Sequence, residues 1–260
     1  MAYHFSIQDY ILTAIRDYQP SKELLKSRVI LVTGAGDGIG RVAAKTFAEY
    51  GATVILLGRT SKKLEAVYDE IVAQGSPQPL IHPLDLELAT PDDYDLLASA
   101  ISDELGRLDG VLHNASILGK RTPIANYDIN SWCQVMHVNV TAQFMLTQAL
   151  LPLLEKSEDA SIIFTSSGVG RKSRAFWGAY AVSKFATEGL METLADELDG
   201  VTNIRVNCIN PGATRTRMRA QAYPAEDVKL NPYPEQIMGA YLYLMGPDSK
   251  TVQGQSLNAQ

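Results

Sequence analysis

Val29-Ile-Leu-Val-Thr-Gly-Ala-Gly-Asp-Gly-Ile-Gly40 is the stretch that decides the fold. Its apolar, β-branched run stops at Thr33, glycines follow, and a helical pattern continues from Arg41 to Tyr50. A second β-branched run, Thr53 to Leu57, completes a βαβ unit. Glycines in such a turn allow a sharp bend, close approach of a pyrophosphate and tight helix packing, while the helix N-terminus supplies free N–H groups. The stretch therefore predicts a dinucleotide site, although a purely structural turn also selects glycine.

Short apolar runs alternate with longer amphipathic segments, which is typical of a parallel sheet covered by helices on both faces. Strands are predicted near residues 29–33, 53–57, 80–84, 109–113, 160–165, 204–209 and 253–257. Helices are predicted near residues 38–50, 61–74, 91–105, 130–155, 175–198 and 234–245. The expected fold is α/β: a doubly wound, seven-stranded parallel sheet of the Rossmann type, with right-handed crossovers and one domain over residues 28–260.

Two segments lie outside this alternation. Residues 1–27 are predicted to be an N-terminal extension, which either covers a groove of the domain or of a neighbouring subunit, or forms a loosely packed tail. Residues 211–234 contain Pro224 and Pro232 and lack a clean period, so they predict a loop with a short helix beside the strand ends. Within it, residues 213–234 are the expected substrate loop.

Composition excludes several classes of function. A formal net charge of −6 over 260 residues, with no basic stripe, argues against nucleic-acid binding. Without a long apolar run or a secretory pattern in the first twenty residues, the chain is expected to be cytoplasmic with no membrane span. Cys133 and Cys208 are expected to be buried and reduced. The scattered histidines predict no metal site.

Tyr180 and Lys184 stand four residues apart in a predicted helix and so share one face. A tyrosine and a lysine at this spacing usually lie on the protein surface and have no catalytic role. Here the helix follows a strand ending at Thr165-Ser166-Ser167-Gly168, and ligands of open α/β sheets bind outside the carboxyl ends of strands. A phenol that works near neutral pH needs a stabilised phenolate, and Lys184 is placed to supply a cation that lowers the phenol's pKa.

Several motifs together resemble the classical short-chain dehydrogenase/reductases. In chain order they are Thr33-Gly34-x3-Gly38-Ile39-Gly40, Asn114-Ala115, Asn139, Ser167, Tyr180-x3-Lys184 and Pro211-Gly212. Wider stretches, such as Trp177-Gly-Ala-Tyr-Ala-Val-Ser-Lys-Phe-Ala-Thr-Glu-Gly, are similar to the bacterial YciK-like oxidoreductases. The resemblance covers nearly the whole chain from Val29. It implies an enzyme that transfers a hydride between a nicotinamide cofactor and a carbonyl or alcohol.

The resemblance also implies catalytic roles. Tyr180 would exchange a proton with the substrate oxygen, while Lys184 would hold the nicotinamide ribose hydroxyls and lower the pKa of the phenol. Ser167 would orient the substrate oxygen, with the neighbouring Ser166 less suited, and Asn139 would support a water leading from Lys184 to solvent. Without the resemblance, Ser167 would be read as a turn hydroxyl and Asn139 as a helix residue bonded to backbone.

Further cofactor contacts follow from the resemblance. Asn114 would brace the sheet, with Ser116 standing where the family usually has glycine, and Asp85 would lie near the adenine unless it caps a helix. In the Pro211-Gly212 loop, which also suits a plain turn, the Thr214 backbone and the Thr216 hydroxyl would bind the carboxamide. The expected cofactor-binding residues are Gly34, Gly36, Asp37, Gly38, Ile39, Gly40, Arg59, Asp85, Leu86, Asn114, Ala115, Tyr180, Lys184, Pro211, Gly212, Thr214 and Thr216.

The end of the second strand bears on the choice of cofactor. An NAD site usually places an acid there, whereas this chain has Leu57-Gly58-Arg59-Thr60. Arg59, together with Lys62 or Lys63, favours NADP(H) over NAD(H) through charge-assisted bonds to a 2′-phosphate. Asp37 argues in the opposite direction, because its carboxylate would repel that phosphate.

The substrate pocket is expected to be apolar. Besides Ser167, its expected walls are Ile117, Leu118, Trp177, Met218 and Tyr223. The helices near 130–155 and 175–198 resemble the family's subunit-contact helices, which implies a homodimer or homotetramer, although a buried helix of a monomer has similar apolar content. Two other functions stay open: a non-catalytic NADP-binding regulatory or scaffold protein, and an epimerase or dehydratase on the same scaffold.

Overall fold

The computed structural model describes residues 18–260. Within them, seven strands form one sheet in the order β3-β2-β1-β4-β5-β6-β7, and every neighbouring pair is parallel. The strands are β1 (Val29–Thr33), β2 (Thr53–Gly58), β3 (Leu80–Pro83), β4 (Gly110–His113), β5 (Ala160–Thr165), β6 (Ile204–Asn210) and β7 (Ser256–Asn258). The predicted seven-stranded Rossmann fold is confirmed.

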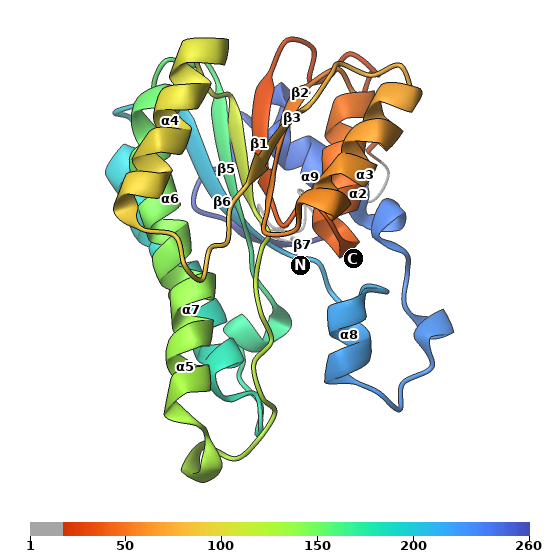
Figure 1. Cartoon of the computed structure of the whole chain (residues 1–260), viewed down its shortest axis with the longest axis vertical. Helices are drawn as coiled ribbons and strands as arrows, with labels where there is room; N and C mark the ends of the chain where they lie inside the picture. The colour runs from red at the N-terminus through yellow and green to blue at the C-terminus, as the bar shows by residue number, and fades with distance from the viewer. Residues whose placement is uncertain (1–17) are drawn as a thin grey trace, which may run out of the picture.

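Helices cover both faces of the sheet (Figure 1). One face carries α2 (Gly38–Glu49), α3 (Ser61–Ala73) and α9 (Met238–Met245), and the other carries α4 (Pro91–Leu105), α6 (Ala142–Leu154) and α7 (Gly178–Leu198). Side chains of β1 alternate between the two layers: Ile30 and Val32 pack in the first, Val29 and Leu31 in the second. Because both faces are buried, the strands read as continuous apolar runs.

The strand order reverses beside β1, whose neighbours are β2 and β4. Connections that leave β1 and β4 in opposite directions open a crevice at the carboxyl ends of these strands. Thr33 joins the two strand ends, because its hydroxyl accepts hydrogen bonds from the backbone N–H groups of Asn114 and Ala115, each at 2.9 Å. The glycine turn and Asn114 therefore meet at the crevice.

The long helix predicted over residues 130–155 is not continuous. It consists of α5 (Ile129–Met136), a π-helical turn (His137–Thr141) and α6. Asn139 lies inside the π turn, and such a turn has a wider hydrogen-bond ring than the helices that flank it. A period of apolar residues cannot distinguish this interruption from a regular helix.

Three other predicted boundaries are corrected by the backbone. The helix predicted from residue 175 begins at Gly178, because Phe176 has a positive φ of 71°. Strand β7 begins at Ser256 instead of 253, after Gly254 with a φ of +64°. The helix predicted from residue 234 starts as a 3₁₀ turn (Pro234–Ile237) before α9. The remaining short 3₁₀ turns are Ile124–Asn126, Gly168–Gly170, Val228–Leu230 and Pro247–Ser249.

The flanking segments pack on this core. Of the predicted N-terminal extension, residues 1–17 lie outside the described residues, whereas Leu25 is fully buried and its N–H donates to the Tyr50 carbonyl at 2.9 Å. The expected loop after β6 contains the short helix α8 (Arg217–Ala222). Cys208 is buried as predicted, but Cys133 is exposed on α5. In residues 18–260, the helices fall short of the length and apolar character that crossing a bilayer requires.

Candidate active site

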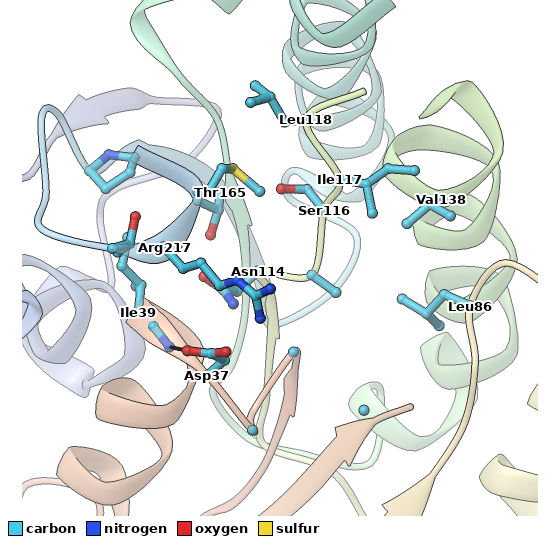
Figure 2. A pocket seen from close by; sticks show the side chains of 18 of the residues that line it. Asp37, Ile39, Leu86, Asn114, Ser116, Ile117, Leu118, Val138, Thr165 and Arg217 are labelled. Atoms are coloured by element: carbon cyan, nitrogen blue, oxygen red, sulfur yellow. Dashed lines mark hydrogen bonds between the residues drawn. The ribbon is translucent and has the colours of Figure 1, made fainter. Parts of the chain in front are cut away.

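A cavity of about 640 Å³ lies at the carboxyl edge of the sheet, between the strand ends and α8. Figure 2 shows it from close by, with Asp37 and Ile39 near one end and Leu118 near the other. Most of the residues expected at the site line it: Gly34, Gly36, Asp37, Gly38, Ile39, Arg59, Asp85, Leu86, Asn114, Ala115, Ile117, Ser167, Trp177, Tyr180, Lys184, Pro211, Gly212, Thr214 and Thr216. Gly40, Asn139 and Tyr223 are not among its lining residues.

The glycine turn after β1 leaves bare backbone on the floor of this cavity. Gly34 and Gly38 have φ values of +67° and +52°, which favour glycine. A Cβ at Gly36 would lie 2.9 Å from the Lys63 Cβ, and one at Gly40 would lie 2.4 Å from the Gly34 carbonyl oxygen. Gly40 is therefore a packing residue. The turn fits a group that must approach the backbone and the N-terminus of α2 closely.

Asp37 does not present a free negative charge to the cavity. Its carboxylate accepts hydrogen bonds from the Gly38 N–H at 2.8 Å and from the Lys63 ammonium at 2.5 Å. The bond from Lys63 lowers the pKa of Asp37, and the nearby Arg217 guanidinium acts in the same direction. The expected repulsion of a phosphate by Asp37 is thus offset by a cation from α3, a contact that the sequence did not reveal.

Two of the three candidate phosphate-binding cations line the cavity. Arg59 lies directly after β2, and Lys63 lies in the first turn of α3. Lys62 is not a lining residue. Arg59 is exposed, so its guanidinium is accessible to a ligand at this end.

Ser167 and Tyr180 meet at the other end of the cavity. The Ser167 hydroxyl is hydrogen-bonded to the Tyr180 phenol, which is 7% exposed. Burial raises the pKa of Tyr180 to about 12, and the bond from Ser167 opposes this only partly. The expected lowering of this pKa by Lys184 is not found. The phenol is consequently protonated near neutral pH.

Lys184 is buried one helical turn after Tyr180. Its ammonium donates a hydrogen bond to the Thr165 carbonyl at 2.7 Å and lies 5.6 Å from the centre of the Tyr180 ring. Burial lowers the pKa of Lys184 to about 8, because a charged amine loses its hydration there. The ammonium and the phenol thus lie on one face of α7, against the end of β5.

Asn139 is placed beside the cavity wall with its side-chain hydrogen bonds made to protein. Its amide oxygen accepts from the Ile117 N–H at 2.8 Å, and its amide nitrogen donates to the Ile117 carbonyl and to Ser183 Oγ, each at 3.0 Å. The side chain is fully buried. These bonds fasten the segment after β4 to α7, and the support of a water by Asn139 stays a prediction.

Three other polar residues expected to bind the cofactor form hydrogen bonds with residues close to them in the sequence. The Asp85 carboxylate accepts from the Glu87 N–H at 3.1 Å and does not cap α4, whose N-cap is Thr90. Thr216 caps α8 by accepting from the Arg219 N–H at 3.1 Å. The Thr214 hydroxyl donates to the Pro211 carbonyl at 2.9 Å. The Thr216 hydroxyl accepts the capping bond and keeps its own proton to donate, so the predicted carboxamide contact is compatible with helix capping.

The apolar wall is a cluster beside Tyr180. Trp177, Ala222, Leu118 and Met218 belong to it. Tyr223 packs behind Trp177, with ring centres 5.8 Å apart, and so lies outside the cavity that it was expected to line. The predicted apolar pocket is otherwise assembled from segments far apart in the sequence.

Sequence reasoning missed several lining residues, among them Val138, Thr165 and Arg217. Figure 2 shows the Arg217 side chain extending into the cavity toward Asn114. The alternating arginines at 215, 217 and 219 were a signal for it, whereas Thr165 acts through its carbonyl and Val138 is an ordinary apolar residue. Within residues 18–260, no group of three or more His, Cys, Asp or Glu side chains is arranged to hold a metal.

Comparison with known proteins agrees with this geometry. The family model described as short chain dehydrogenase matches residues 28–227. The uncharacterized oxidoreductase YciK of Escherichia coli K12 is 55% identical over 243 residues, which are 94% of this chain and 96% of that relative.

Solved structures extend the similarity to the fold. A short chain dehydrogenase from Pseudomonas syringae is 65% identical, with a TM-score of 0.93 over 94% of this chain and 99% of that one. A short chain dehydrogenase from Shigella flexneri 2a, complexed with NADP, is 54% identical, with a TM-score of 0.90 over 92% of this chain and 100% of that one. These matches show that the chain belongs to the short-chain dehydrogenase family.

Proposed function

We propose that this protein is an NADP(H)-dependent oxidoreductase that interconverts a carbonyl and an alcohol, with Tyr180 as the general acid and base. The observation that carries the proposal is the position of Ser167, Tyr180 and Lys184 beside β5, in a cavity that also holds Arg59 and Lys63 beside β2, with β1 and β4 between the two strands. A nicotinamide dinucleotide has its reactive ring and its adenosine 2′-position at opposite ends, as this cavity requires.

Three features support NADP(H) as the cofactor. The glycine turn offers bare backbone for a pyrophosphate. Arg59 and Lys63 can pair with a 2′-phosphate, and no acid follows β2 to bind a ribose 2′-hydroxyl in its place. The similar Shigella flexneri protein was solved as a complex with NADP. When bound, the reduced cofactor supplies the hydride.

The side chains of Tyr180, Ser167 and Lys184 account for the transfer of a proton to the substrate oxygen. Tyr180 and Ser167 are close enough to share a hydrogen bond, so both hydroxyls can be directed at one substrate oxygen. With a pKa of about 12, the phenol carries its proton near neutral pH and can give it to the developing alkoxide. The Lys184 ammonium lies 5.6 Å from the centre of the phenol ring, on the same face of α7, where it can bind the ribose hydroxyls of the cofactor beside the reacting group.

The oligomeric state proposed for this enzyme is a homodimer or homotetramer. Phe144 on α6 and Val182 and Phe185 on α7 are 48%, 41% and 45% exposed, on the two helices that the family resemblance assigns to subunit contacts. Light scattering with size-exclusion chromatography tests this proposal. A monomer at micromolar concentration would refute it.

A screen of NADPH oxidation against aldehydes and ketones tests the function. Tyr180→Phe should lower turnover by about 10²- to 10⁴-fold, since it removes the proton donor and little else. Tyr223→Phe is the matched control, because Tyr223 belongs to the same cluster but does not line the cavity, and it should keep most of the activity.

The outcomes separate the alternatives. Binding of NADPH without turnover of any carbonyl, and no effect of Tyr180→Phe, would favour a non-catalytic NADP-binding protein. Isomerised or dehydrated product without net oxidation of NADPH would favour an epimerase or dehydratase. Either result would overturn the proposed reaction.

A further inference from the structure

A second polar cluster lies on the far side of Lys184 from the cavity. Its centre is Glu188, which follows Lys184 by one turn of α7 and is 8% exposed. The carboxylate accepts hydrogen bonds from Ser166 Oγ, from the Arg171 guanidinium at 3.3 Å and from the Cys208 thiol. Neither Glu188 nor Arg171 lines the cavity, so neither is placed to touch a cofactor or substrate.

This cluster joins α7 to the end of β5 at consecutive residues. The Thr165 carbonyl accepts from Lys184, the Ser166 hydroxyl donates to Glu188, and the Ser167 hydroxyl is bonded to Tyr180. The bond between Ser166 and Glu188 thus lies between the bonds that Thr165 and Ser167 make to Lys184 and Tyr180. If Glu188 moved, Ser166 would move with it, and so would Thr165 and Ser167 on either side.

Arg171 anchors the cluster from the other side. Its guanidinium donates to Ser256 Oγ at 2.9 Å, to Asn258 Oδ1 at 2.7 Å and to the Leu257 carbonyl at 2.9 Å. The position of the Glu188 carboxylate is thus set by the edge strand β7 as well as by β5. Such a network gives the carboxylate one defined place relative to Lys184.

Among the titratable groups around Lys184, Glu188 is the one that can stabilise its positive charge. From α7, Lys184 is faced by Glu188 and by the neutral Tyr180 phenol, and from β6 by the Cys208 thiol. Burial raises the pKa of that thiol well above its ordinary value, so it is uncharged near neutral pH. Glu188, one helical turn further along α7, therefore opposes the lowering of the Lys184 pKa by burial.

We propose that Glu188 is a positioning residue of the active site: held by Ser166 and Arg171, it keeps the buried Lys184 charged and the end of β5 aligned. The proposal rests on the function proposed above in that it concerns the lysine of the same site. It assigns Glu188 no contact with the reacting atoms.

The test is a direct titration of Lys184 in the ligand-free protein. The ¹³C shift of its side chain is followed from pH 6 to 11 by NMR in lysine-labelled protein, and the signal is assigned with Lys184→Met. Glu188→Gln keeps the shape and removes the charge, so it should lower the pKa of Lys184 by about one pH unit. Glu188→Asp keeps the charge one helical turn from Lys184, so it should lower this pKa less than Glu188→Gln does.

The sign of the shift distinguishes an electrostatic role from a structural one. General loosening of the cluster would admit water and raise the pKa of Lys184 toward its ordinary value, whereas loss of the Glu188 charge should lower it. Glu192→Gln, one turn further along α7 at an exposed position, makes the same change of charge and should leave the titration unchanged. If Glu188→Gln does not fold, Glu188→Asp still tests the proposal: with the charge kept and the side chain shortened, the pKa of Lys184 should fall slightly and should not rise.

Two results would overturn the proposal. One is a Lys184 titration that Glu188→Gln leaves where it was; the other is a rise of the Lys184 pKa in Glu188→Gln. The measurement needs no substrate and no turnover, so a failure of the proposed reductase activity is recorded separately. Once a substrate is found, the alkaline limb of kcat against pH should move to lower pH in Glu188→Gln and stay in place in Glu192→Gln.

Discussion

Arg59→Ala should separate the affinities for NADPH and NADH. The guanidinium lies directly after β2, lines the cavity and is exposed. A hydrogen bond to a charged group contributes about 1.5 to 3 kcal/mol, and solvent screening at an exposed site places this one near the lower end. A loss of about 1.5 kcal/mol raises the Kd for NADPH by about tenfold. NADH lacks the 2′-phosphate, so its Kd should not change.

Fluorescence titration of the reduced cofactors measures both constants without a substrate. Lys62→Ala is the matched control, because Lys62 is an exposed cation in the first turn of α3 that does not line the cavity. Raising the salt concentration should shrink the difference between wild type and Arg59→Ala, since exposed charges are screened. Equal losses for NADPH and NADH, or an equal loss in Lys62→Ala, would refute the assignment of Arg59 to the phosphate.

Two further predictions concern stability. Gly40→Ala should lower the free energy of unfolding by about 1 to 3 kcal/mol and impair NADPH binding, because its Cβ would lie 2.4 Å from the Gly34 carbonyl oxygen; Gly189→Ala, with no atom within 4 Å of its Cβ, should raise it by about 0.5 to 1 kcal/mol. Thermal unfolding of both variants checks this, and equal effects would contradict it. Burial lowers the pKa of His113 to about 3. Below about pH 6.5 the imidazole is protonated in the unfolded chain but stays neutral in the folded one. The free energy of unfolding therefore decreases as the pH falls from about 6.5 toward 3. Urea unfolding at pH 7 and pH 4.5 should show a smaller loss in His113→Asn than in wild type, and parallel losses would rule this cause out.

The fold could be predicted from the sequence because its evidence is local. The β-branched runs, the glycine turn after Thr33 and the helical periods each depend on residues that are neighbours in the chain. Their alternation leaves one arrangement of a parallel sheet with right-handed crossovers. Boundaries were less accurate where backbone conformation decides them, as at Phe176 and Gly254.

The sequence predicted which residues meet at the candidate site, but not how deeply they are buried or which charges surround them. Tyr180 and Lys184 share a helical face by their spacing, and the motifs that resemble the family named their neighbours. Nothing in the spacing shows how deeply these groups are buried. Burial is what raises the pKa of Tyr180 to about 12 and lowers that of Lys184 to about 8.

The sequence by itself determined the sheet, the phosphate-binding type of turn and the residue types that meet at the strand ends. Only the tertiary structure decided which charges face each other: Lys63 against Asp37, and Arg171 with Ser166 around Glu188. The physical reason is that periodicity and turn chemistry act over a few residues, whereas electrostatic interaction and desolvation depend on distance in space. Electrostatic interaction and desolvation at this site are set by residues from separate elements. Their separation in the sequence does not reveal how close they lie in space.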